Sequence, residues 1–189
     1  VRQELVNNHD YKDTLELYES IVAPRLRVEK HKRNDALTGI IPFLYNAVSK
    51  TVAGKLCGIM LLLNADAYTG SLEQQMTSLD SLWAGCHSNY EAQLSPEEKA
   101  AYQLLDDGDQ TAFRVFRDLA RIGKGSFFIS YGEAQERLHT NGSRLIGKFH
   151  EYGILEVIAK GTQRQPGQRG KAGTYRWGLP FLLLESSAA

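Results

Sequence analysis

The spacing of apolar residues changes near residue 110, and this change constrains the fold more than any other feature of the 189-residue chain. Before that point, apolar residues recur every three or four positions, which predicts helices throughout. After it, short helical patterns alternate with the β-prone runs SFFIS, ILEVIAKG and TYRWGLP. We therefore predict a mainly α protein with a helical bundle at 1–105, a mixed domain at 110–180 and a tail at 181–189. The acidic segment DDGD at 106–109 is the expected boundary.

Two helix starts in the first part carry the strongest local signals. Ser71 and Gln74 have the spacing of a capping box, in which each side chain accepts a hydrogen bond from the backbone N–H of the other residue. The segment SPEEKAAYQLL has Ser95 as the predicted cap, Pro96 as the first helical residue and Glu98 three residues after the cap. These spacings predict helices that begin after Ser71 and after Ser95.

The mixed domain opens with QTAFRVFRDLARIG, which predicts a helix. A second helix, YGEAQERLH, and a turn, TNGS, precede a third helix, SRLIGKFHEYG, which we expect to end at Gly153. In the first of these helices we expect four residues to be buried and three arginines to lie largely outside: Ala112, Val115, Phe116 and Leu119, and Arg114, Arg117 and Arg121.

This order of helix, short strand, helix, turn, helix and β-hairpin resembles a winged helix-turn-helix domain. The residues that carry the resemblance are Ala134, Leu138, the turn at 140–143, Ile146, Phe149 and the run at 153–155. The resemblance implies that the loop of the hairpin is the wing and that the helix after the turn enters a DNA groove.

Two sets of residues are the expected DNA contacts. On the third helix, Ser143, Arg144 and Lys148 lie outside the apolar stripe, where they can meet phosphates or base edges. The loop of the hairpin contributes cations and amide donors that suit phosphates: Arg164, Gln165, Gln168, Arg169 and Lys171. The alternatives are that these side chains are only solvated, and that Tyr175 and Trp177 pack in a core rather than stack on bases.

The charges are unevenly distributed, although the formal net charge of the chain is zero. Residues 1–109 hold 10 Lys/Arg and 16 Asp/Glu, whereas residues 110–180 hold 12 and 5. A basic part of this kind favours a polyanionic partner. Winged helices also bind other proteins, so protein docking and a purely structural role remain as alternatives.

A second basic cluster precedes a helix in the first part. In EKHKRNDAL, Lys30, Lys32 and Arg33 come just before Asn34, a credible N-cap. This segment and the helices after it resemble the helical accessory domains that follow the catalytic core in bacterial, phage and plasmid primase or primase-polymerase proteins. The resemblance implies that these four residues contact template or nucleotide. The alternative is that Asn34 only caps the helix and the cations are solvated. Pro42 is expected to kink that helix or to start a new one.

Several function classes lack their sequence signals. The chain has no GxxxxGK[ST] loop, no carboxylate pair spaced for polymerase metals and no zinc-ligand spacing. Cys57 and Cys86, without CxxC spacing, are predicted to be reduced core thiols. No apolar run approaches the roughly 20 residues that a membrane span needs. We expect no catalytic residue, metal or cofactor in this chain alone, no membrane contact and a cytoplasmic location. Val1 in place of Met suggests a piece of a longer, primase-like enzyme.

These observations together predict a non-catalytic DNA-binding module of a primase-like or initiator protein of replication. Its expected partners are duplex, single-stranded or primer-template DNA, and a catalytic primase or helicase domain in cis or in trans. One rival is a dimeric winged-helix transcriptional regulator, which needs two-fold symmetry to read two half-sites. The other is an interaction scaffold, which would show no salt-dependent affinity for DNA.

Overall fold

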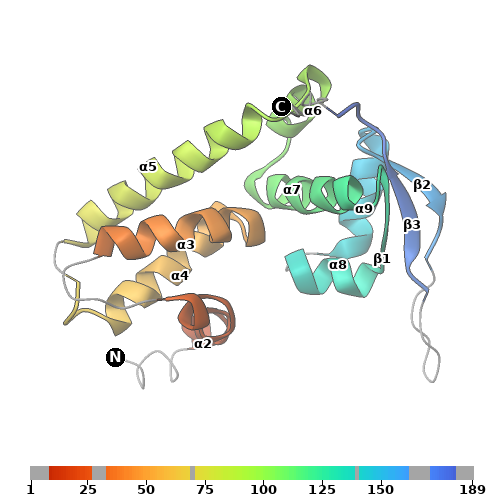
Figure 1. Cartoon of the computed structure of the whole chain (residues 1–189). Coiled ribbons are helices and arrows are strands. Elements are labelled where there is room, and N and C mark those ends of the chain that lie inside the picture. Colours follow the sequence, from red (N-terminus) through yellow and green to blue (C-terminus); the bar gives the residue numbers. More distant parts are fainter. Residues whose placement is uncertain (1–8, 27–32, 69–70, 139–140, 162–170, 182–189) are drawn as a thin grey trace. The chain divides into compact units, whose positions relative to one another are not determined.

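The computed structural model of the chain describes residues 9–26, 33–68, 71–138, 141–161 and 171–181 (Figure 1). The chain divides into two units, Val1–Asn89 and Tyr90–Ala189. Helices dominate both units, and the second also holds a small three-stranded antiparallel sheet. The predicted mainly α class is therefore confirmed.

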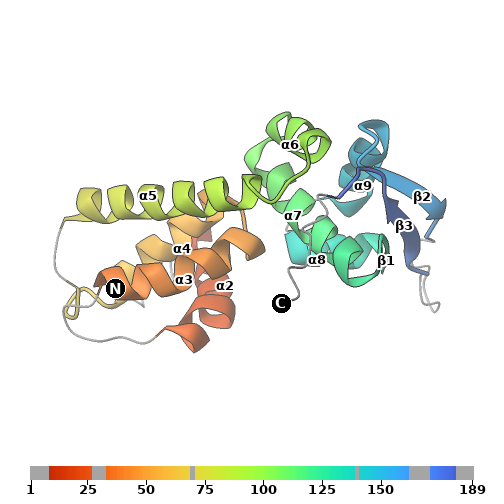
Figure 2. The ribbon, with the colours of Figure 1, turned by 45° about the horizontal axis from the view of Figure 1, so that its top comes forward.

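The first unit is helical in all its described elements (Figure 2). These are α2 (His9–Leu17), the π-helical turn η1 (Tyr18–Val22), the 3₁₀ turn η2 (Ala23–Arg25), α3 (Arg33–Ala47), α4 (Lys50–Leu63) and α5 (Leu72–Glu91), whose last two residues belong to the second unit. Leu37, Ile41 and Leu44 of α3 are fully buried, as are Leu56 and Met60 of α4. The ring of Tyr45 meets that of Trp83 edge to face at 5.0 Å, which joins α3 to α5.

Pro42 does not divide α3, which continues through it to Ala47. Proline removes one intrahelical hydrogen bond, here the one that the carbonyl of Thr38 would accept. Both Thr38 and Pro42 are exposed, so this carbonyl lies on the solvent side of the helix. The loss of this hydrogen bond is tolerated because water can donate to the carbonyl in place of the missing N–H.

The second unit contains α6 (Pro96–Gln103), α7 (Asp107–Ile122), β1 (Ser126–Ile129), α8 (Tyr131–Leu138), α9 (Gly142–Glu151), β2 (Leu155–Ala159) and β3 (Gly173–Trp177). The sheet order is β1-β3-β2, with β3 antiparallel to both neighbours. The helices pack on one face of the sheet, where the rings of Phe116, Phe127 and Phe149 meet. Both predicted capping boxes are present: Ser71 pairs with Gln74, and Ser95 with Glu98.

The division between the units differs from the boundary expected at 106–109. Helix α6, which the sequence pattern assigned to the helical bundle, belongs to the second unit. Its Glu98, which is fully buried, accepts hydrogen bonds from Arg117 of α7 and from the indole N–H of Trp177 of β3. The acidic segment at 106–109 only caps α7, since the carboxylate of Asp106 accepts from the backbone N–H of Asp109.

The orientation of α7 is the second correction to the sequence analysis. Arg114 and Arg117, expected outside, are only 1% and 3% exposed, whereas Arg121 is exposed as predicted. Ala112 and Phe116 are fully buried as expected, but Val115 and Leu119 are only half buried, and Phe113, which the pattern did not include, is fully buried. Helix α6 covers the face of α7 that carries the two arginines. Because the sequence pattern assigned α6 to another domain, it predicted that this face of α7 is exposed to solvent.

A buried ionic network holds α6, α7 and β3 together. The Arg117 guanidinium donates to both carboxylate oxygens of Glu98, at 2.7 and 2.9 Å, and to the carbonyl of Gln93 at 2.8 Å. Trp177 donates to the same carboxylate at 3.1 Å. Burial opposes the charge of Arg117, but the hydrogen bonds and charge of Glu98 outweigh it and raise the Arg117 pKa. Beside this pair, Arg114 donates to the hydroxyls of Tyr102 and Thr111.

Helices α8 and α9 approach closely at Gly142. Asn141 caps α9 by accepting from the backbone N–H of Arg144. A Cβ on Gly142 would lie 2.4 Å from the carbonyl oxygen of Tyr131 and 3.0 Å from the Cβ of Ala134. Only glycine fits this contact, which sets the distance between the two helices. Gly153, with φ of 69°, ends the segment after α9 as expected.

We predict that Glu98→Ala lowers the free energy of unfolding by about 3–5 kcal/mol, because it leaves the buried charge of Arg117 without its partner. Glu97→Ala, on the exposed side of the same helical turn, is the control and should cost under about 1 kcal/mol. Urea unfolding followed by circular dichroism measures both. Equal losses in the two variants would show that the buried pair contributes nothing special.

We also predict that Gly142→Ala destabilises the protein by about 1–3 kcal/mol, since the added methyl group forces α8 and α9 apart. Gly147→Ala in the same helix is the matched control, because its added methyl group would meet no atom within 4 Å beyond the adjoining helix backbone. That change should stabilise α9 by up to about 1 kcal/mol. Thermal unfolding of both variants tests the opposite signs, and stabilisation by Gly142→Ala would contradict the close contact.

Candidate nucleic-acid interface

The exposed side of α9 carries two of the predicted contact residues. Leu145, Ile146 and Phe149 face the core, and Ser143 and Arg144 are exposed in the first turn of the helix. This arrangement follows from the helical spacing, which puts the three buried residues on one stripe. Ser143 and Arg144 thus lie outside the apolar stripe, as predicted.

Lys148 lies one turn after Arg144 but is held by the protein itself. Its ammonium group forms an ion pair with the carboxylate of Asp109 and lies 3.8 Å from that of Asp106. It also lies 5.8 Å from the centre of the Tyr152 ring. The hydrogen bond from Lys148 to Asp109 raises the Lys148 pKa. A phosphate would therefore have to compete with carboxylates for this cation.

The hairpin arms meet closely where the described part of the β2–β3 connection begins and ends. A Cβ on Gly161 would lie 2.8 Å from the backbone N of Gly173 and from the carbonyl O of Lys171. Lys160 and Lys171 are exposed beside this contact. The predicted contacts Arg164, Gln165, Gln168 and Arg169 lie outside the described residues.

Tyr175 and Trp177 are 1% and 5% exposed and pack in the core, as the alternative to base stacking predicted. Tyr175 lies 5.9 Å from Phe127, and Trp177 meets Phe113 edge to face at 4.9 Å. Neither ring can stack on a base in this arrangement. The exposed aromatic side chain of the sheet is instead Phe128 of β1, at 72%, which the sequence analysis did not single out.

The charge imbalance of residues 110–180 overstates the basic surface of the folded unit. Arg114 and Arg117 are buried and cannot meet a phosphate. The unit also includes the acidic residues between Tyr90 and Asp109. Between α7 and the end of β3, the exposed cations among the described residues are Arg121, Lys124, Arg137, Arg144, Lys160, Lys171 and Arg176.

The second predicted cluster lies at the start of α3. Lys30 and Lys32 are outside the described residues, and Arg33 is the first residue of the helix. Asn34 is therefore the second helical residue rather than the N-cap that the sequence suggested. Asn34 has helical backbone, whereas an N-cap residue has extended backbone.

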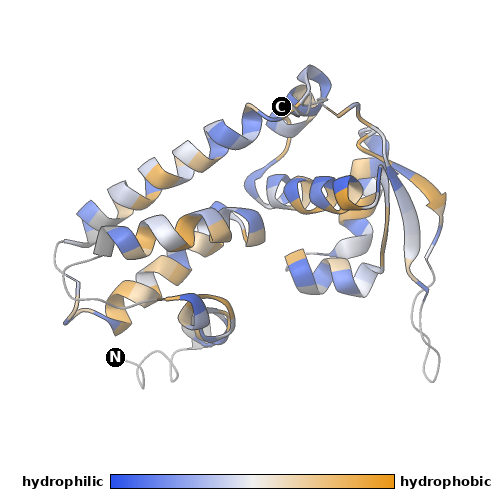
Figure 3. Ribbon diagram, viewed as in Figure 1, coloured by the Kyte–Doolittle hydropathy of each residue, from blue (hydrophilic) through white to orange (hydrophobic). Residues whose placement is uncertain are grey.

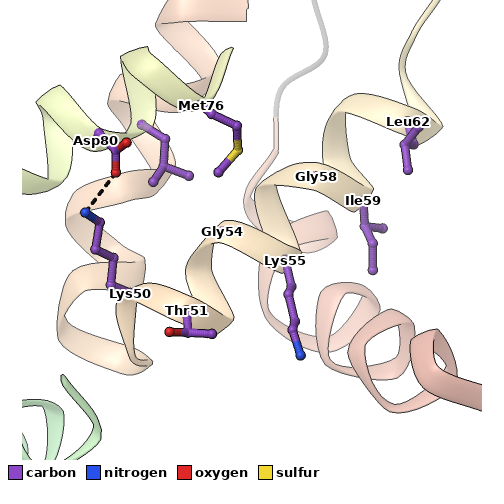
Figure 4. A pocket seen from close by; sticks show the side chains of 10 residues that line it. Lys50, Thr51, Gly54, Lys55, Gly58, Ile59, Leu62, Met76 and Asp80 are labelled. Atoms are coloured by element: carbon purple, nitrogen blue, oxygen red, sulfur yellow. Dashed lines mark ion pairs between the residues drawn. The ribbon is translucent and has the colours of Figure 1, made fainter. Parts of the chain in front are cut away.

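An apolar groove of about 540 Å³ between α4 and α5 is a feature that the sequence analysis missed (Figure 4). Gly54 and Gly58 lower its floor on α4, and Leu62 and Met76, half exposed, form its margins. The ion pair between Lys50 and Asp80, at 2.8 Å, bridges the two helices at one end. Its lining is mostly apolar, and its polar side chains are those of Lys50, Thr51, Lys55 and Asp80.

Within the described parts of the chain, no group of three or more His, Cys, Asp or Glu side chains is placed to hold a metal ion. Cys57 is buried and Cys86 half buried, and burial raises the pKa of the Cys57 thiol to about 12. None of the helices in these parts is long and apolar enough to cross a membrane.

Comparison with known proteins gives no match: no protein-family model, no curated protein and no solved structure is significantly similar to the chain.

Proposed function

We propose that the second unit is a winged helix-turn-helix domain that binds DNA through α9 and the β2–β3 connection. In this proposal Ser143 and Arg144 meet the groove and its phosphates, and the connection that includes Arg164, Gln165, Gln168, Arg169 and Lys171 is the wing. The chain alone carries out no chemistry. Its role is that of a DNA-binding module in a primase-like or initiator protein of replication.

The observation that carries the proposal is the order of elements from α7 to β3 and the way they assemble. The order is helix, strand, two helices and a hairpin. The three strands form a sheet of order β1-β3-β2, and α8 and α9 pack closely against each other. In a helix-turn-helix element, the second helix lies in the major groove and its first turn contacts base edges. Ser143 and Arg144 are exposed in that turn of α9.

The electrostatics support binding that depends on salt and is moderate in strength. Arg144, Lys160 and Lys171 are exposed cations on α9 and beside the hairpin. Lys148 is engaged with Asp109, and the acidic first turn of α7 lies beside it. A protein with few phosphate contacts loses affinity only gradually as the salt concentration rises. Its affinity increases when a neighbouring domain binds the same DNA.

The assignment to replication rests on the similarity of residues 29–48 to the helical accessory domains of primases. In this proposal the first unit contacts template or nucleotide through Lys30, Lys32, Arg33 and Asn34, and a catalytic domain acts in cis or in trans. The mass of the particle in solution separates this proposal from a dimeric regulator, which requires a two-fold assembly.

The proposal predicts weaker DNA binding when cations are removed from α9 or the wing. Fluorescence anisotropy at two salt concentrations should show lower affinity for a short duplex in Arg144→Ala and in Arg164/Arg169/Lys171→Ala, with a salt slope flatter by about one unit per lost contact. Arg137→Ala, which removes an exposed cation paired with Glu133 on α8, is the control. If the parent protein binds no DNA even at low salt, the proposal is wrong.

The Asp109–Lys148 ion pair leads to a prediction of opposite sign. Asp109→Asn keeps the shape of the side chain but removes the nearer of the two carboxylates beside Lys148, so affinity for the duplex should rise severalfold and the salt slope should steepen by about one unit. Asp107→Asn removes the same charge from the same turn but leaves the ion pair in place. If both variants change the affinity equally, net charge alone acts, and Lys148 makes no DNA contact.

A further inference from the structure

The outer face of the sheet in the second unit carries an unusual exposed aromatic side chain. On β1, Phe127 and Ile129 are buried, and Phe128 between them is 72% exposed on the opposite face. Sheets with one solvated face normally present polar side chains there. Among the described residues of this face, Phe128 is the largest apolar surface, and nothing in the core requires it.

The strand register shows what surrounds Phe128. Its partner on β3 is Thr174, and Thr174 in turn faces Ala159 of β2. The register shifts between Val157 and Ala159, so Ile158 is the extra residue of a bulge, and it is 49% exposed. The apolar character of β2 is visible in Figure 3. Phe128 and Ile158 therefore flank a small polar residue and form an open, shallow platform.

Cations lie at both ends of this platform. Arg176, two residues from Thr174 on β3, is a diagonal neighbour of Phe128 on the same face. Lys124 lies in the turn before β1, and Lys160 and Lys171 flank the hairpin at the other end of the strands; all are exposed. The one acidic side chain on this face among the described strand residues is Glu156, which pairs with Arg176 at 3.4 Å.

An aromatic ring between cations is the arrangement that binds single-stranded nucleic acid. Every base presents a flat π-face that can stack on an aromatic side chain, and the phosphates on either side pair with Lys and Arg. The Arg176–Glu156 pair is exposed, and exposed pairs contribute little to stability. A phosphate can therefore replace Glu156 as the partner of Arg176 at little cost.

We propose that the outer face of this sheet binds single-stranded DNA, with an unpaired base stacked on Phe128 and the flanking phosphates held by Arg176, Lys124 and Lys171. This inference rests on the proposed DNA-binding function and extends it, because the platform lies beside the wing rather than on α9. It gives the domain two surfaces, one for duplex and one for an unpaired strand. Such a pair of surfaces suits the junction at which a duplex meets its single strand.

The test compares Phe128 variants on two DNA probes, a short oligothymidylate and a hairpin duplex, by fluorescence anisotropy at low salt. Phe128→Ala and Phe128→Leu should both lower affinity for oligothymidylate about tenfold, because stacking needs the ring and not merely apolar area. Phe128→Trp should retain the affinity, and its own fluorescence should be quenched by the bound base. Ile122→Ala, at an even more exposed apolar residue of α7, is the matched control and should change nothing.

The outcomes separate this inference from the proposed function. If Phe128→Ala binds oligothymidylate as tightly as the parent does, while the wing variant loses duplex affinity, the inference is wrong and the proposed function stands. If Phe128→Ala instead converts a dimeric parent to monomers with unchanged DNA affinity, the platform is a protein interface and the inference is overturned. If the parent binds neither probe, both proposals fail together.

Discussion

The buried pair between Glu98 and Arg117 is the interaction on which the second unit depends. It joins α6 to α7, and through the indole of Trp177 it also fixes β3, the central strand of the sheet. A buried charge is costly unless its partner is well placed, so each of these elements is needed for the others to fold correctly. The guanidinium of Arg117 has one nitrogen, Nη1, without a hydrogen-bond partner in the described part of the protein; the Tyr90 ring lies 5.7 Å from its carbon.

The same network explains why the surface of this unit is less basic than its sequence. Arg114 and Arg117 are buried in the core, and Lys148 forms an ion pair with Asp109 in the acidic first turn of α7. The described cations left at the surface are spread over α7, α8, α9, the hairpin and the outer face of the sheet. A nucleic acid would therefore meet several separate contacts rather than one strongly charged groove.

Local signals in the sequence predicted local structure well. The two capping boxes, the helix around Leu145 and Phe149, and the glycine at 153 are encoded within a few residues, and the structure has each of them. The predictions failed where a segment distant in the sequence determines whether a side chain is buried. The burial of Arg117 depends on Glu98, 19 residues away. The exposure of Phe128, for which no prediction was made, depends on which face of the sheet the helices cover. Periodicity alone cannot show that a helix has two covered faces.

The candidate site follows the same division. The exposure of Ser143 and Arg144 could be read from helical spacing, because a single stripe settles it. The pairing of Lys148 with Asp109 could not, since 39 residues separate them. The groove between α4 and α5 and the platform around Phe128 also escaped prediction, because each is made by the meeting of elements and not by a motif.

The contact between Glu98 and Trp177 has a consequence for how the chain folds, since 79 residues separate its partners. The α6–α7 pair can form early, because Glu98 and Arg117 enclose a short loop, whereas β3 must close a much longer one. The sheet is then completed only when the last strand is added between β1 and β2, and contacts this distant slow folding. On a ribosome, the indole can reach its carboxylate only after Trp177 itself has left the exit tunnel, 79 residues after Glu98.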